Sequence, residues 1–94
     1  MSDVASPPVS AEEKAAAEAA FRQAARDFGH ARAIYQADAG QQELFKTRRD
    51  AFQAARSKAA DAGVSTIEAI ATAEKKAGRR QAEAELGESA DIIR

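Results

Sequence analysis

Aromatic side chains recur at seven-residue intervals in two stretches of this chain. Phe21, Phe28 and Tyr35 form the first set, and Phe45 and Phe52 form the second. Because an α-helix makes 3.6 residues per turn, a step of seven returns each ring to nearly the same face. Alanines occupy intervening positions on the first of these faces: Ala17, Ala24 and Ala31. Large rings separated by methyl groups form a ridged stripe, so the pattern predicts helices that pack against one another along this face.

Alanine dominates the composition, with 26 of the 94 residues, and it is the strongest helix former. It adds little apolar surface, and large apolar residues are few. Burying each of these contributes roughly 1.5–3 kcal/mol, while ordering the backbone costs about 1–2 kcal/mol per residue. We therefore expect a monomer of marginal stability, for which a partner or a second copy supplies further burial.

Capping and turn signals divide the chain into segments. We expect residues 1–9 to form a flexible, disordered tail, because the two prolines in it cannot propagate a helix. Ser10 and Glu13 have the capping-box spacing that opens a helix, and Gly40 and Gly63 can end one. The expected helices lie at about 11–37, 41–61 and 65–86, within one domain over residues 10–88 that is followed by a frayed segment at 89–94.

The third expected helix has the weakest local signals. Ser65 and Glu68 repeat the capping-box spacing at its start. Gly78 lowers its helix propensity, and we expect Gly87 to end it. Gly29, inside the first helix, indicates either close approach of another backbone or a local bend. We therefore expect the third helix to be shorter and less firmly anchored than the first two.

The conformation of Gly40 decides between two folds. If Gly40 is left-handed, the chain reverses and Phe45 and Phe52 fold back over the first aromatic set as an antiparallel hairpin. One long helix through Gly40 would keep the seven-residue phase and dimerise as a coiled coil. Its seam would then carry polar or charged residues: Asp38, Gln42, Arg49 and Arg56. We therefore favour an all-α fold, a small three-helix bundle in which a shorter third helix joins the hairpin.

The formal net charge of −1 conceals an uneven distribution. Residues 46–80 contain nine basic and four acidic side chains and carry +5, while the flanks carry −3 each. Such a basic region can attract an anionic partner, or its charges can pair with neighbouring acids within the chain. The candidate partner-binding residues are the basic side chains of the second and third helices: Lys75, Lys76, Arg79, Arg80, Arg49 and Arg56.

The segment around Gly63 resembles a helix-turn-helix over about twenty residues. The N-terminal end of its second helix would enter the major groove. That end offers Ser65, Thr66 and Glu68, with no Arg, Asn or Gln to read bases. An ordinary turn between two helices has the same sequence features.

The sequence contains no catalytic or metal-binding signature. His30 is the sole histidine, the chain has no cysteine, and no glycine-rich phosphate loop occurs. We expect His30 to lie on the helix surface or at the edge of a packing seam, and we expect no enzymatic activity, metal, cofactor or small-molecule substrate. The absence of a signal peptide and of a long apolar run favours a cytoplasmic protein that does not act on a membrane.

These features predict a small non-enzymatic binding protein, an adaptor, regulator or inhibitor that acts through helix-face contacts. The expected partner is another protein or a second copy of this chain. The alternative is a helix-turn-helix-like regulator that binds DNA through the basic region 46–80. A third interpretation is a structural subunit that only self-associates.

Overall fold

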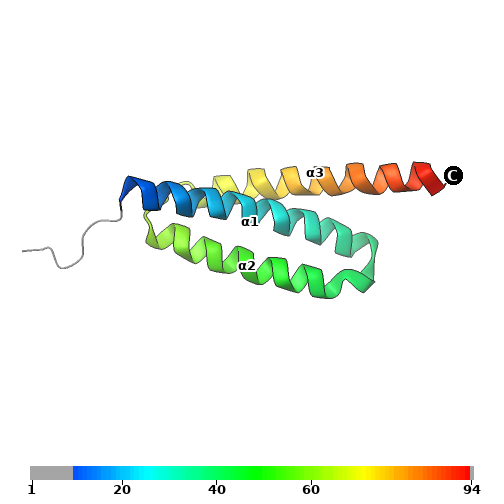
Figure 1. The fold of residues 1–94 in the computed structure, drawn as a ribbon, viewed down its shortest axis with the longest axis horizontal. Helices are drawn as coiled ribbons and strands as arrows, with labels where there is room; N and C mark the ends of the chain where they lie inside the picture. The colour runs from blue at the N-terminus through cyan, green and yellow to red at the C-terminus, as the bar shows by residue number, and fades with distance from the viewer. Residues whose placement is uncertain (1–9, 94) are drawn as a thin grey trace, which may run out of the picture.

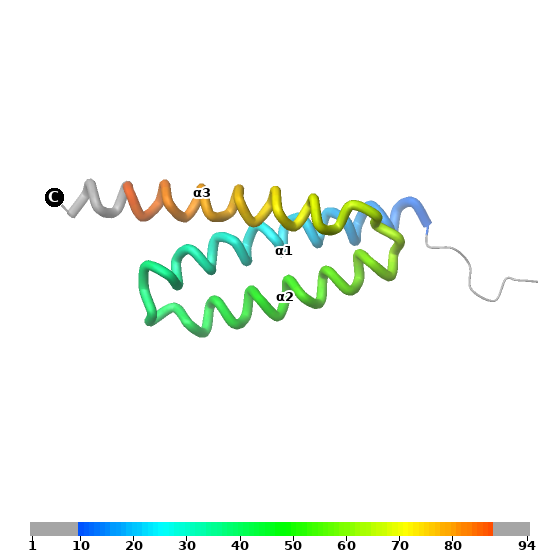
Figure 2. Tube along the Cα trace, turned by 180° about the vertical axis from the view of Figure 1, so that it is seen from behind, coloured from blue at the N-terminus to red at the C-terminus, as the bar shows by residue number. Residues whose placement is uncertain are grey.

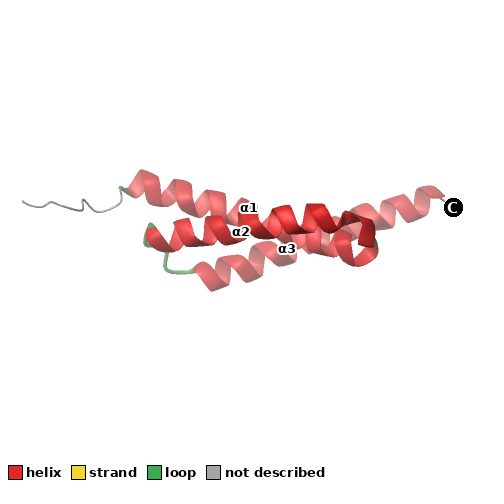
Figure 3. Ribbon diagram, turned by 90° about the horizontal axis from the view of Figure 1, so that it is seen from below, coloured by secondary structure: helices red, strands yellow, loops and turns green. Residues whose placement is uncertain are grey.

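The computed structural model describes residues 10–93, with side chains described as far as Gly87, and all of its long elements are helices (Figures 1 and 3). They are α1 (Ala11–Ala37), a short 3-10 turn η1 (Ala39–Gln41), α2 (Gln42–Asp61) and α3 (Ile67–Ile93). No strand occurs between residues 10 and 93, so the predicted all-α fold is confirmed. The expected flexible tail at residues 1–9 lies outside the described residues.

The predicted capping box opens α1. The Glu13 backbone N–H donates to Ser10 Oγ at 3.0 Å, and the Ser10 N–H donates to Glu13 Oε1 at 3.2 Å. These two bonds satisfy backbone donors that have no partner inside the helix. The helix then runs to Ala37, as the sequence predicts.

Asp38, and not Gly40, makes the reversal after α1. Asp38 is extended, with φ −144° and ψ 102°, and its carboxylate accepts a hydrogen bond from the Gly40 N–H at 2.9 Å. Among the described residues only Gly63 has a positive φ, so the prediction of a left-handed Gly40 is wrong. The aspartate turns the chain instead, because its side chain substitutes for a backbone acceptor within the turn.

The hairpin of α1 and α2 is confirmed, and five aromatic rings hold it together. Phe52 stacks on Phe21 and on Phe28, with ring centroids 5.6 and 5.1 Å apart. Phe45 lies between Phe28 and Tyr35, at 5.7 and 5.0 Å. The rings therefore alternate between the two helices, as the matching seven-residue spacings require.

Gly63 ends α2 in the left-handed conformation, with φ 88°. The Val64 N–H donates to Ala59 O at 3.0 Å and the Gly63 N–H to Ala60 O at 3.1 Å. This pair of bonds is the Schellman motif, and it is accompanied by burial of Val64 and Ala59. The predicted stop after Asp61 is therefore confirmed.

The start of α3 lies two residues later than predicted. The helix begins at Ile67, and the Ile70 N–H donates to Thr66 O at 3.0 Å, which places Thr66 at the cap. Ser65 is then one position too early to form the predicted capping box with Glu68. The Glu68 carboxylate accepts a hydrogen bond from Arg56 instead.

The end of α3 also differs from the prediction. The helix does not stop at Gly87 but continues to Ile93, and it projects beyond the turn between α1 and α2 (Figure 1). It has 27 residues, the same as α1, so it is not a shorter helix. A single glycine lowers helix propensity by about 1 kcal/mol, which is too little to stop a helix rich in alanine and glutamate.

Helix α1 is the central element of the bundle. It packs on both other helices and makes its most extensive contact with α3, which runs beside it in the same direction (Figures 1 and 2). Helices α2 and α3 meet near the turn that joins them and then separate (Figure 2). The buried core gathers side chains from all three helices and the α2–α3 turn: Phe21, Ala25, Phe52, Ala59, Val64, Ile70 and Ala71.

Two glycines bring α1 and α3 into backbone contact. A Cβ atom added at Gly29 would lie 2.2 Å from Lys75 O, and one added at Gly78 would lie 2.0 Å from Arg26 O. Of the two explanations for Gly29, close approach of another backbone is therefore confirmed. Gly78 does not merely weaken α3, because it is the matching contact on the other helix. The prediction that the third helix is less firmly anchored is wrong.

Candidate binding groove

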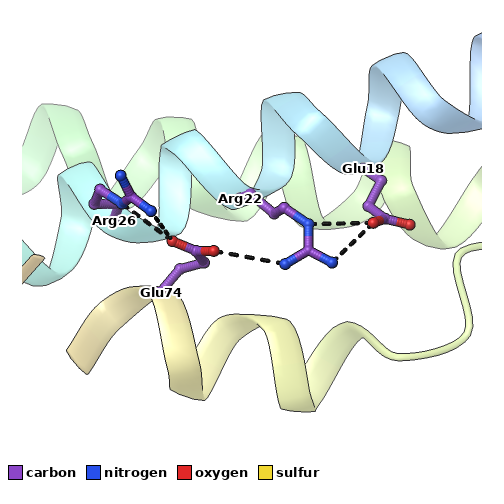
Figure 4. Close-up of polar contacts among 4 residues, drawn as sticks. All are labelled: Glu18, Arg22, Arg26 and Glu74. Carbon is purple, nitrogen blue, oxygen red and sulfur yellow. Dashed lines mark hydrogen bonds and ion pairs between the residues drawn. The ribbon is translucent and has the colours of Figure 1, made fainter. Parts of the chain in front are cut away.

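Glu74 forms the main polar link between α1 and α3 (Figure 4). Its carboxylate accepts from Arg26 Nη2 at 2.8 Å and Nε at 3.1 Å, and lies 3.5 Å from Arg22 Nη1. Arg22 also donates to Glu18 at 2.9 Å, one turn earlier on α1, and this bond raises the pKa of Arg22. Only 13% of the Glu74 side chain is exposed, so this carboxylate is enclosed by arginines and committed to helix packing.

The two arginines predicted as partner-binding residues on α2 are also engaged within the fold. Arg56 forms an ion pair with Glu68 of α3. Arg49 places its guanidinium 6.0 Å from the centroid of the Phe45 ring, and its Nε lies 3.5 Å from Asp50 Oδ1. The Arg56 pair links α2 to the start of α3, whereas both contacts of Arg49 lie within α2.

Lys75 has a structural contact as well. Its ammonium nitrogen lies 5.4 Å from the centroid of the Phe52 ring, so the cation faces the aromatic π-system of α2. Its backbone is the surface that Gly29 approaches. Lys75 therefore connects all three helices, and replacing it would disturb the packing as well as the surface charge.

The remaining members of the α3 cluster lie on different faces. Lys76 and Arg79 join Arg32 and Gln36 of α1 around a groove of about 390 Å³, whereas the exposed Arg80 does not line it. We call this hollow the basic groove. Its lining is drawn from α1 and α3 alone: Gly29, Arg32, Ala33, Gln36, Lys75, Lys76 and Arg79.

The basic groove has an uncompensated positive charge. None of its lining residues is acidic, and four of the seven are cationic. Arg79 donates to Glu83 at 3.1 Å, one turn further along α3, and this exposed pair is weak. Within the described residues, Arg32 and Lys76 form no ion pair. The groove therefore offers at least two cations that are free to bind an anionic group.

A second hollow, of about 230 Å³, has mixed charge. It is lined by residues of all three helices: Asp27, His30, Ala31, Leu44, Arg48 and Gln81. From this lining, His30 Nε2 donates to Glu85 Oε1 at 2.7 Å across the α1–α3 seam. This bond, followed by one from Gln81, lowers the pKa of Glu85. His30 thus lies at the edge of a packing seam, as predicted, and its hydrogen-bonding partner is a carboxylate and not the hydroxyl of a serine or threonine.

The segment around Gly63 lacks helix-turn-helix geometry. Helices α2 and α3 run in nearly opposite directions and separate beyond the turn that joins them (Figures 1 and 3), whereas the helices of that motif cross at about 90–120°. The start of α3 is also used internally, because Ile70 is buried and Glu68 binds Arg56. The alternative reading of this segment, an ordinary helix-to-helix turn, fits the observed arrangement.

Sequence reasoning missed Arg32 and Gln36. They lie 44 and 40 positions before Lys76 in the chain, and only the docking of α3 on α1 brings them to the same groove. A signal was nevertheless present, since Arg32 and Gln36 are three and seven residues after Gly29 and share its helical face. If Gly29 indicates the face of α1 on which another helix docks, then the residues on the same face are candidates for lining a groove between the two helices.

Comparison with protein-family models, with curated proteins and with solved structures found no match for this chain. Among the side chains that the structure describes, from Ser10 to Gly87, no group of three metal-ligating residues is close enough to hold an ion. The same part of the chain contains no helix with the length and apolar character needed to cross a bilayer. The functional argument therefore depends on the residues of the basic groove.

Proposed function

We propose that this protein is a small non-enzymatic binding protein that holds an acidic stretch of a partner protein in the basic groove. The observation that carries the proposal is the lining itself: cations from two helices converge on one hollow that contains no carboxylate. Side chains that converge in this way favour an anionic ligand, because Arg32 and Lys76 can neutralise an added anion without displacing an internal ion pair.

The rest of the fold supports this function by holding the groove in shape. Gly29 and Gly78 set the distance between the groove-forming helices, since their backbones touch. The Glu74 carboxylate fixes the register of the same two helices through Arg22 and Arg26. A groove that is formed before binding lowers the entropy cost of association.

A partner protein fits the charge distribution better than a nucleic acid does. The chain as a whole has a net charge of −1 and a pI near 5.8, whereas a nucleic-acid-binding domain is usually strongly basic. The concave groove also presents few cations, and the DNA backbone needs many phosphate contacts for useful affinity. DNA binding through residues 46–80 is therefore the alternative function, and a binding experiment with both kinds of polyanion distinguishes it from protein binding.

The experiment compares two polyanions as probes, poly-L-glutamate and short duplex DNA, by fluorescence anisotropy over a range of salt concentrations. The groove variant combines Arg32→Gln with Lys76→Gln. Its matched control combines Lys46→Gln with Arg80→Gln, which removes the same charge from exposed positions outside the groove. The variants carry equal net charge, so only the location of the charge differs between them.

We expect the wild-type protein and the control to bind poly-L-glutamate. The groove variant should bind roughly five- to thirtyfold more weakly, for the loss of about 1–2 kcal/mol from two ion pairs. Equal binding by the two variants would mean that the groove is only a solvated surface. A wild-type preference for duplex DNA that the groove variant loses would replace this proposal with the DNA-binding regulator.

A further inference from the structure

We infer that the occupant of the basic groove is an α-helix of the partner protein, with carboxylates one turn apart along one face. This inference rests on the proposed function and adds the shape of the ligand to its charge. The observations behind it are the spacing of the polar groups, the nature of the groove walls and the small side chains in the lining.

The spacing of the polar side chains follows the helical repeat. Arg32 and Gln36 are four residues apart on α1, while Lys76 and Arg79 are three apart on α3. At ~1.5 Å rise per residue, each pair spans about 4.5–6 Å along its helix. Helices α1 and α3 run in the same direction (Figure 2). The two pairs of side chains are therefore repeated along parallel axes. Acidic residues at positions i and i+3 or i+4 of a helical ligand repeat at the same distance.

The walls of the groove favour a helical ligand over an extended one. Both walls are α-helices, whose backbone N–H and C=O groups are already paired within each helix. An extended peptide would find no strand edge there and would leave its own backbone groups to water. A helix satisfies its backbone internally, so only its side chains need partners from the groove.

The small lining residues allow a ridge of side chains to enter. Gly29 and Ala33 present at most a methyl group between the longer polar side chains. A volume of about 390 Å³ accommodates a short row of side chains and not a whole helix. The occupant would therefore lie across the opening with one ridge inserted, which is how helices pack on helices.

Two synthetic peptides of identical composition test the inference. The matched peptide is a helix of alanine and glutamine with glutamate at positions i, i+4, i+7 and i+11, which share one face. The permuted peptide distributes the same glutamates around the helix. Affinities are measured by fluorescence anisotropy for the wild-type protein, the groove variant and the charge-matched control. Circular dichroism verifies that each variant is folded, and the charge-conserving pair Arg32→Lys with Lys76→Arg provides a rescue.

The expected result is that wild type, control and rescue variant bind the matched peptide about tenfold more tightly than the permuted one. The groove variant should lose this preference. Equal binding of both peptides through the groove would overturn the helical ligand and leave the proposed function standing. Equal affinity of the groove variant and the control for both peptides would overturn the proposed function as well.

Sedimentation of the protein alone distinguishes a second copy from a separate partner. The first turn of α1 is acidic, with Glu12 and Glu13, so another copy of this chain also carries a carboxylate-bearing helix. We expect the sedimentation of wild type and groove variant to be the same. Self-association that the groove variant abolishes would assign the groove to a second copy and overturn the separate partner.

Discussion

Helix α1 uses opposite packing chemistries on its two faces. Toward α2 it presents large rings, which interleave with partner rings at centroid distances of 5.0–5.7 Å. Toward α3 it presents Gly29, and the two helix backbones come into contact there and at Gly78. The first interface gains stability from the apolar volume that it buries. The second gains stability from close approach, which brings many backbone and methyl atoms to van der Waals distance.

Opposite kinds of substitution should therefore destabilise the two interfaces. Removing atoms damages the aromatic face, because a cavity remains where a ring was. Adding atoms damages the glycine face, because no space exists for them. This asymmetry also bears on the groove, since the glycine contact sets the spacing of the helices that form its walls.

The largest expected effect is on the aromatic face. Phe52→Ala should lower the free energy of unfolding by about 3–5 kcal/mol, because Phe52 is 6% exposed and contacts Phe21, Phe28 and Lys75. Urea denaturation followed by circular dichroism measures this loss. Phe45→Ala is the comparison, and it should cost less because the Phe45 ring is only half-buried. Equal losses at the two positions would mean that the depth of burial does not control this interface.

The second-largest effect on stability is expected at the contact of α1 with α3, where Gly29 and Gly78 lie. Gly78→Ala should destabilise the protein by about 1–3 kcal/mol, although alanine has the higher helix propensity, because its Cβ would meet the backbone of Arg26. Gly87→Ala is the matched control on the same helix, with nothing within 4 Å of the added atom. It should stabilise the protein by up to about 1 kcal/mol. Thermal unfolding of both variants is the measurement, and the same sign of change in both would contradict backbone contact at Gly78.

The polar link between α1 and α3 should contribute less. Glu74→Gln should lower stability by about 1 kcal/mol, because it removes the charge that Arg22 and Arg26 share while keeping one acceptor oxygen. Glu83→Gln removes an exposed pair within α3 and should cost no more than a few tenths of a kcal/mol. Chemical denaturation at low and high salt tests this difference, and a Glu83→Gln loss as large as that of Glu74→Gln would refute it.

The smallest expected effect is a pH dependence of stability, which arises where His30 of α1 meets Glu85 of α3. The hydrogen bond donated by His30, with a second from Gln81, holds the pKa of Glu85 below its ordinary value of 4.5. The folded state thus binds this proton less readily than the unfolded chain. Its contribution to stability is complete above pH 4.5 and is lost as the pH falls through the lowered pKa.

Melting temperatures of wild type and Glu85→Gln between pH 7 and pH 3 measure this contribution. The wild type should melt higher at neutral pH, and the difference should shrink below pH 4.5. A difference that stays constant over the whole range would show that the charge of Glu85 does not matter to the seam.

The sequence predicted the aromatic interface better than the glycine interface. The seven-residue spacing of the rings identified both helices of the hairpin and the pairing of Phe45 and Phe52 with the first aromatic set. The docking of α3 had no comparable signal, because glycine and alanine produce no periodic pattern of large apolar residues. Gly78 therefore looked like a weakness in its helix, whereas it is a contact point.

The candidate site also combines features that the sequence predicted with features that it did not. The sequence showed the basic side chains of residues 75–80, but it did not show toward which part of the fold each of them points. The structure directs Lys76 and Arg79 to the groove, leaves Arg80 outside it, and places Lys75 against Phe52. These outcomes depend on the rotation of α3 about its axis, which the contact of Gly78 with α1 decides.

The sequence by itself determined where the helices begin and end along α1 and α2, since caps, alanine content and ring spacing act over a few residues. It also determined that one face of each would carry rings. Only the tertiary structure decided that α3 docks on α1 at Gly29 and Gly78, and that Arg32 joins Lys76 in one groove. The physical reason is that close backbone approach requires two complementary surfaces to meet in space. A local stretch of sequence specifies one of these surfaces, but it does not specify which other surface packs against it.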